Sequence, residues 1–139
     1  MKHSIVIVDD HVLIAKALRS IMANFVDFEV WYECENGRDL QNKLAAQNKV
    51  PTIVLLDISM PIMDGFETAL WLKENHPNVL VMALSMQDDD TSVIKMIKNG
   101  AKGYMLKNTH PADLEIALKA LIASGYYYPA WAASKVFAS

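Results

Sequence analysis

The sequence predicts an α/β fold in which helices cover both faces of a single parallel sheet. Three uninterrupted apolar runs, at residues 52–56, 5–8 and 79–84, have the composition of strands that are buried on both faces. The segments between these runs repeat apolar residues at the spacing of amphipathic helices. Strands that alternate with helices in this way form a doubly wound parallel sheet with right-handed crossovers.

The first half of the chain supplies two strands and two helices before the central strand at 52–56. The first strand, residues 5–8, is followed by a helix whose apolar side carries Ile14, Leu18, Ile21 and Phe25. The second strand, residues 27–32, is mixed in character and is therefore expected near a sheet edge. A modest amphipathic helix follows, with Leu40 and Leu44 on its inner side.

The second half repeats the pattern around a fourth strand at 79–84 and a fifth at 103–106. The helix before the fourth strand stops ahead of Pro77, because the residue before a proline disfavours helical geometry. The next helix starts at the aspartates 88–90, whose charge suits a helix N-terminus, and ends at Asn99-Gly100. The five strands and their helices account for nearly the whole chain.

The last helix is expected to begin at Thr109 and Pro111 and to close at Gly125. Residues 1–125 therefore form one predicted domain. Residues 126–139 are interpreted as a C-terminal tail, or as the start of a linker to an output domain that is absent from this sequence, with one or two helical turns at 130–138.

The composition predicts a cytoplasmic, single-domain protein. With 139 residues the chain is long enough for one packed core. The formal net charge of −3 gives no electrostatic case for nucleic-acid binding by these residues, and no apolar run is long enough to span a membrane. The single cysteine, Cys34, excludes an internal disulfide and suits a reducing compartment.

Chemically reactive side chains follow four of the five predicted strands. Asp9 and Asp10 end the first, Asp57 the third and Ser85 the fourth, while Lys107 follows the fifth. Any one of them alone has a simpler interpretation as a helix cap, a turn residue or a solvated lysine. Parallel strands, however, bring these ends to one edge of the sheet, where ligands bind.

The residues at that edge predict phosphoryl chemistry. Three neighbouring carboxylates repel one another and stay ionised only with a cation, for which Mg²⁺ is the natural candidate. A cation, a lysine ammonium and a serine hydroxyl together can hold a phosphoryl group. Asp57 is then a credible phosphoryl acceptor that forms an acyl phosphate.

Over residues 4–125 the chain resembles the response-regulator receiver domains of two-component signalling. The similarity rests on Ile-Val before Asp9-Asp10, on Leu-Leu-Asp57 with the following Met-Pro and Met-Asp-Gly, on Ala-Leu-Ser85, and on the run 100–107. His11 and the segment 113–125 resemble the NarL/LuxR-type subgroup. The resemblance implies a flavodoxin-like fold with strand order 2-1-3-4-5.

The family implies a role for each site residue. Asp57 would accept the phosphoryl group from a sensor histidine kinase. Asp10 would bind Mg²⁺ directly and Asp9 mainly through water, Asp57 would itself be a ligand, and the Ser59 backbone carbonyl would complete the set; Mn²⁺ is expected to substitute. Lys107 would pair with the phosphoryl oxygens.

The family also implies how the signal would leave the site. Ser85 would move toward the phosphate and Tyr104 would turn inward with it, which changes the surface formed by the fourth helix, the fifth strand and the fifth helix. The expected output is control of transcription through a DNA-binding domain that is not in this sequence, with a possible homodimer on phosphorylation. Such a protein is a self-phosphorylating and self-dephosphorylating acceptor rather than a turnover enzyme.

The chain departs from the common receiver pattern at two positions. Many receivers have a proline in a cis bond after the lysine, whereas this chain has Asn108. The position after the serine is often small, whereas here it is Met86. Ser59, Met86 and Gln87 are predicted to flank the mouth of the pocket.

Three other functions are possible interpretations of the same residues. A stand-alone phosphotransfer shuttle that acts by protein binding stays open as an alternative. A phosphohydrolase of the haloacid-dehalogenase type is disfavoured, because such enzymes place Asp-x-Asp after the first strand, whereas here Ser59 is two residues beyond Asp57. A degenerate receiver that only docks partners is disfavoured by the complete set of acidic, serine and lysine residues.

Overall fold

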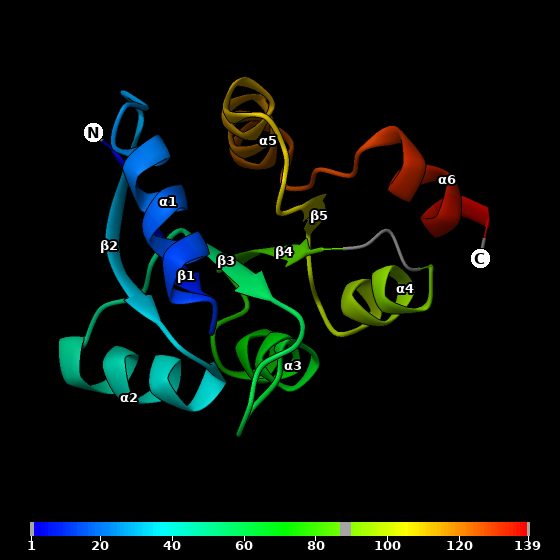
Figure 1. The fold of residues 1–139 in the computed structure, drawn as a ribbon. Coiled ribbons are helices and arrows are strands. Elements are labelled where there is room, and N and C mark those ends of the chain that lie inside the picture. The colour runs from blue at the N-terminus through cyan, green and yellow to red at the C-terminus, as the bar shows by residue number, and fades with distance from the viewer. Residues whose placement is uncertain (1, 87–89, 139) are drawn as a thin grey trace.

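The computed structural model describes residues 2–86 and 90–138, the last four of these as backbone only. Its five strands form one sheet in the order β2-β1-β3-β4-β5 (Figure 1). The strands are β1 (His3–Val8), β2 (Phe28–Cys34), β3 (Ile53–Asp57), β4 (Leu80–Ser85) and β5 (Gly103–Leu106). The helices are α1 (Val12–Met22), α2 (Gly37–Gln47), α3 (Gly65–Asn75), α4 (Asp90–Lys98), α5 (Pro111–Ser124) and α6 (Ala130–Ala138).

Every strand pair in this sheet is parallel, which confirms the predicted flavodoxin-like topology and strand order. The mixed strand β2 lies at one edge, as its composition predicted, although it runs two residues further than expected because β1 pairs with it as far as Cys34. The strands β1, β3 and β4, which contain the uninterrupted apolar runs, occupy the middle of the sheet. Burial on both faces thus decides which strands are central.

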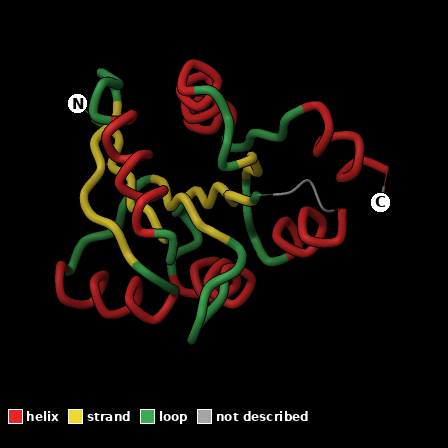
Figure 2. Tube along the Cα trace, viewed as in Figure 1, coloured by secondary structure: helices red, strands yellow, loops and turns green. Residues whose placement is uncertain are grey.

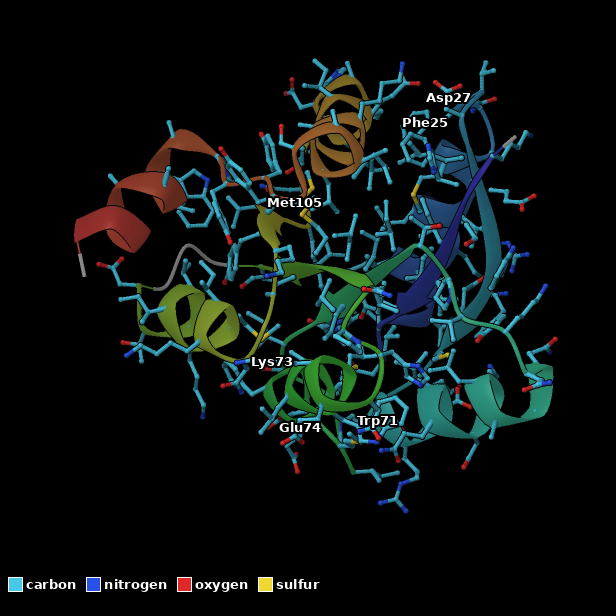
Figure 3. All side chains as sticks on the ribbon, turned by 180° about the vertical axis from the view of Figure 1, so that it is seen from behind. Phe25, Asp27, Trp71, Lys73, Glu74 and Met105 are labelled. Carbon is cyan, nitrogen blue, oxygen red and sulfur yellow. The ribbon has the colours of Figure 1, made fainter. Side chains whose placement is uncertain are left out.

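Helices cover the two faces of the sheet in separate layers (Figures 1 and 2). The layer of α1 and α5 packs on alternate strand residues that include Ile5 and Ile7, and the layer of α2, α3 and α4 packs on those between, such as Val6 and Val8. Figure 3 shows the Met105 side chain between β5 and α5, where it belongs to the first of these cores. Because successive strand residues point to opposite faces, one continuous apolar run serves both cores.

The ends of α4 and α5 fit the sequence signals, with one correction. Gly100 and Gly125 both adopt left-handed backbone geometry, with φ of 106° and 83°, as expected of glycines that end helices. The N-cap of α5, however, is His110 rather than Thr109, and its Nδ1 accepts a hydrogen bond from the Ala112 amide. The Thr109 hydroxyl instead donates to the Leu106 carbonyl oxygen at 2.6 Å, so it closes the turn after β5.

The segment after α5 folds back onto the domain. The Tyr127 carbonyl oxygen accepts a hydrogen bond from the Tyr104 amide at 3.1 Å, and the Tyr127 amide donates to the Lys102 carbonyl oxygen at 2.9 Å. This pairing continues the sheet beyond β5 and directs α6 to lie beside α4 (Figure 1). Residues 130–138 are helical as predicted, and Ala132 is fully buried. Among the helices of residues 2–86 and 90–138, none combines the length and the apolar character that a bilayer crossing requires.

Candidate functional site

The carboxyl ends of four strands, β1, β3, β4 and β5, bring the candidate residues together. Val8 of β1 pairs with Leu56 of β3, so Asp9 and Asp57, which follow these two residues, come out at the same edge. The Lys107 amide donates to the Ser85 carbonyl oxygen at 2.8 Å, and this bond fixes the start of the loop after β5 against the end of β4. The parallel register alone therefore places the acidic residues, the serine and the lysine on one side of the molecule.

The Lys107 ammonium lies between two buried carboxylates. Its Nζ is 2.9 Å from Asp9 Oδ2 and 3.1 Å from Asp57 Oδ1. The side chains of Lys107 and Asp9 are almost completely shielded from solvent, and that of Asp57 is 6% exposed. The lysine thus already neutralises part of the acidic cluster before any ligand is bound.

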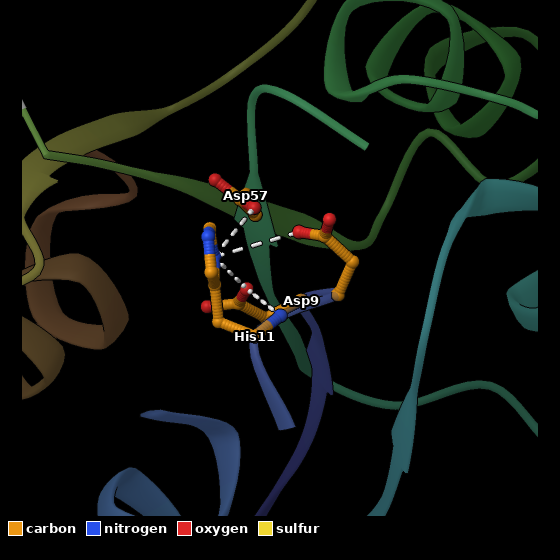
Figure 4. Close-up of side chains that lie close together, drawn as sticks. Asp9, His11 and Asp57 are labelled. Carbon is orange, nitrogen blue, oxygen red and sulfur yellow. Dashed lines mark hydrogen bonds and ion pairs between the residues drawn. The ribbon is translucent and has the colours of Figure 1, made fainter. Parts of the chain in front are cut away.

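His11 also lies in this cluster, which the sequence analysis did not anticipate. Its Nδ1 is 3.0 Å from Asp9 Oδ1, 3.5 Å from Asp10 Oδ1 and 3.7 Å from Asp57 Oδ2 (Figure 4). The sequence marked His11 only as part of the NarL/LuxR-type pattern, and a helix cap was the simple interpretation of Asp9 and Asp10. The N-cap of α1 is His11 instead, but its side chain makes no capping hydrogen bond and turns into the site.

The surroundings of Asp57 disfavour its charged form. Burial and the nearby charge of Asp9 raise the pKa of the Asp57 carboxyl to about 7, although the Lys107 ammonium opposes the shift. A further positive charge in the cluster would favour the ionised, nucleophilic form of this carboxylate.

The residues present fit a divalent cation. Buried oxygens of Asp10 (Oδ1) and Asp57 (Oδ2) accept no hydrogen bond from the described part of the chain. One ligand atom from each of Asp9, Asp10, His11 and Asp57 can be chosen so that all four lie within 4.8 Å of one another. Buried carboxylate oxygens without donors, in reach of one point, are the arrangement that a hard cation requires. Asp9, Asp10 and Asp57 are the residues that would hold it.

A pocket of about 300 Å³ opens over Asp57. Its lining includes three residues predicted from the sequence, Ser59, Ser85 and Met86, and one that was not, Ser92 of α4. The Met86 side chain is exposed at this opening, whereas Gln87, the other predicted flanking residue, lies outside the described residues. Space for a phosphoryl-sized group is therefore present beside the Asp57 carboxylate.

The loop after β3 is held close behind Asp57. The Gly65 amide donates to the Ile58 carbonyl oxygen at 2.7 Å, and a Cβ at Gly65 would overlap the Asp57 carbonyl oxygen. The loop also contains Ile62 with a φ of 67°, a costly conformation for a β-branched residue. Asp64 then starts α3 with a capping box to Glu67. Only glycine permits this approach of the helix start to the strand end.

Two features near the end of β5 bear on the predictions for Asn108 and Tyr104. The Lys107–Asn108 peptide bond is trans. The Tyr104 side chain is fully buried.

Comparison with known proteins extends these observations. Residues 5–119 match the family model of the response regulator receiver domain. The chain is 36% identical over 126 residues to the transcriptional regulatory protein DegU of Brevibacillus brevis, across 91% of this chain and 52% of DegU. It is 33% identical over 118 residues to the nitrate/nitrite response regulator protein NarL of Escherichia coli strain K12, across 85% of this chain and 52% of NarL. The chain spans about half the length of these curated relatives.

Solved structures show the same fold. A two-component response regulator of the LuxR family from Aurantimonas sp. SI85-9A1 superposes with a TM-score of 0.86 at 22% identity, across 99% of this chain and 97% of that one. The isolated REC domain of RcsB from Salmonella enterica serovar Typhimurium, solved with the phosphomimetic BeF₃⁻, gives a TM-score of 0.85 at 23% identity, across 98% and 99%. Because the family model spans most of the chain and its relatives are regulators of the NarL/LuxR type, this chain belongs to the response regulator receiver domains.

Proposed function

We propose that Asp57 accepts a phosphoryl group from the phosphohistidine of a sensor kinase. The single observation that carries this proposal is the position of its carboxylate, which is buried at the end of β3 beside Lys107 and the acidic pair and opens onto a pocket. A carboxylate oxygen attacks phosphorus, and the phosphorus–nitrogen bond of the donor breaks with its electron pair on the imidazole. The products are an acyl phosphate on Asp57 and a free histidine on the kinase.

The remaining residues position the charges for this transfer. A bound Mg²⁺, or Mn²⁺ in its place, would neutralise the oxygens of Asp9, Asp10 and Asp57 and attract those of the phosphoryl group, with the Ser59 carbonyl as a further proposed ligand. The Lys107 ammonium, 3.1 Å from Asp57 Oδ1, needs to move little to pair with a phosphoryl oxygen attached there. Ser85 lines the same pocket, and its hydroxyl can donate a hydrogen bond to a second phosphoryl oxygen.

Intact mass spectrometry after incubation with acetyl phosphate tests this proposal. The wild-type protein is expected to gain one phosphoryl group with Mg²⁺ and none with EDTA. Asp57→Asn should abolish the gain. Asp64→Asn is the matched control, because asparagine preserves the N-cap of α3 and should leave labelling intact. Labelling of Asp57→Asn at the wild-type rate would refute the assignment.

The same site would control an output through the surface of α4, β5 and α5. A phosphoryl group adds nearly two negative charges. Ser85 can donate a hydrogen bond to it and Lys107 can pair with it, and Tyr104 lies on β5, the strand that ends just before Lys107. RcsB dimers have been solved bound to DNA, and DegU is a transcriptional regulatory protein. By analogy, phosphorylation would favour a homodimer and act on transcription through a DNA-binding domain beyond this sequence. Amide shifts around Ser85 and Tyr104 on beryllofluoride addition, with light scattering for the dimer, test this step.

A further inference from the structure

The candidate site contains a nitrogen atom to which the acceptor chemistry gives no role. His11 Nδ1 lies 3.0, 3.5 and 3.7 Å from oxygens of Asp9, Asp10 and Asp57, respectively (Figure 4). The ring is half-exposed, yet its Nδ1 edge faces the buried carboxylates. An imidazole so placed either donates a proton to the cluster or offers it a lone pair.

Two polar neighbours lie 3.0 Å from His11 Nδ1, the Lys107 ammonium nitrogen and Asp9 Oδ1. Lys107 Nζ also lies 2.9 Å from Asp9 Oδ2 and 3.1 Å from Asp57 Oδ1. Nδ1 accepts from Lys107 when the imidazole proton is on Nε2, and it donates to Asp9 Oδ1 when the proton is on Nδ1. With the proton on Nε2, Nδ1 and Asp9 Oδ1 are two acceptors 3.0 Å apart, and a cation bound to both would stabilise this arrangement.

The spacing of these acceptors fits common coordination of a metal ion. Metal–ligand bonds of about 2.0–2.2 Å place neighbouring ligand atoms about 3.0–3.5 Å apart in octahedral or tetrahedral sites. The three distances from His11 Nδ1 run from 3.0 to 3.7 Å. Asp57 divides its oxygens between the two partners, because Oδ1 contacts Lys107 while the buried Oδ2 accepts no hydrogen bond from the described residues. The Asp57 oxygen that faces His11 is thus the one left free for a cation.

We infer that His11 Nδ1 is an additional protein ligand beside Asp9, Asp10 and Asp57, and that it makes the site selective for transition-metal ions over Mg²⁺. Imidazole nitrogen suits ions such as Co²⁺ and Zn²⁺, whereas Mg²⁺ takes oxygen ligands. When such an ion binds, Lys107 gives up its contact with Nδ1 but keeps its two carboxylate partners. The inference rests on the cation binding of the proposed function and names the residue that sets its selectivity.

The test compares Co²⁺ and Mg²⁺ affinities of the wild-type protein with those of His11→Ala and His11→Asn. Co²⁺ binding is followed by its visible absorption, and Mg²⁺ binding by calorimetry. His11→Ala should reduce the ratio of Co²⁺ to Mg²⁺ affinity at least about tenfold. Co²⁺-loaded wild-type protein should also show a paramagnetically shifted imidazole N–H proton resonance that both variants lack. His11→Asn keeps a good N-cap residue on α1 and guards against a folding defect.

The control is His110→Asn, which removes a histidine outside the cluster while preserving the cap of α5, and which should leave the ratio unchanged. Equal changes in both affinities on His11→Ala, in either direction, would overturn the inference, because the ring would then only occupy or shape the site. Failure of the wild-type protein to bind either cation or to label Asp57 would overturn the proposed function and this inference together. Normal labelling of Asp57 with an unchanged ratio in His11→Ala would overturn the inference alone.

Discussion

The indole ring of Trp131 in α6 packs edge-on against the phenol ring of Tyr104 in β5, with ring centroids 5.5 Å apart and an interplanar angle of 84°. Tyr104 is fully buried, and Trp131 packs against the same core. This geometry is a favourable one for two aromatic rings. A residue two strands away from Asp57 in the sheet is thereby coupled to the last helix of the chain.

Trp131→Ala is expected to lower the free energy of unfolding by about 2–3 kcal/mol, below the range for a fully buried tryptophan because Trp131 is only partly buried. Urea denaturation measures the change. Tyr126→Ala, in the same segment but 55% exposed, is the control and should cost less than about 1 kcal/mol. Equal, small losses in both variants would show that α6 contributes little to the stability of the domain.

Asp57→Asn is expected to stabilise the metal-free protein, and more so at higher pH. The pKa of Asp57 is about 7 in the folded protein, against an ordinary value of 3.8. The folded state therefore holds the proton more tightly, so the Asp57 contribution to stability falls as pH rises from about 4 to about 7. Asparagine carries no charge, so the Asp57→Asn variant does not lose this stability as the pH rises. Thermal melts in EDTA should show a larger gain at about pH 8 than at about pH 5.

Saturating Mg²⁺ is the control for that experiment. The cation should stabilise the wild-type protein and have much less effect on Asp57→Asn, because one of its ligands is then neutral. A gain in EDTA that is the same at both pH values would contradict the raised pKa of Asp57.

Lys107→Met is expected to destabilise the metal-free protein by about 1–3 kcal/mol at neutral pH. The change removes the ammonium that lies 2.9 Å from Asp9 and 3.1 Å from Asp57, while the protonation of Asp57 limits the loss. Mg²⁺ should recover much of it by supplying the missing positive charge. Thermal denaturation with and without Mg²⁺ measures both effects, and the exposed Lys102→Met serves as the control. An equal response to Mg²⁺ in the two variants would show that Lys107 does not neutralise the cluster.

Met86→Ala is expected to accelerate both acetyl-phosphate labelling and the spontaneous loss of the phosphoryl group. The Met86 side chain lines the pocket and is 63% exposed, so it narrows the path for water and small donors. Ile116→Ala is the matched control, because Ile116 is 61% exposed and does not line this pocket. Phosphoryl half-lives from intact mass spectrometry give the comparison. An unchanged or longer half-life in Met86→Ala would show that Met86 does not restrict access.

The sheet, and the edge at which Asp9 and Asp57 meet, could be predicted from the residues alone. Apolar runs specify strands buried on both faces, and parallel pairing then brings their carboxyl ends together. The glycines that end helices could also be predicted, because their conformations are local properties of the chain.

The contacts that side chains make at those positions depend on tertiary packing. Lys107 contacts His11 across 96 residues of sequence, and no local pattern reports the direction in which an N-cap side chain turns. The packing of Trp131 on Tyr104 likewise depends on how distant segments fill the space between them. The free energies of alternative local conformations, such as different helix caps, differ by only a few tenths of a kcal/mol to about 1 kcal/mol. Long-range packing and ion pairing therefore select among these conformations.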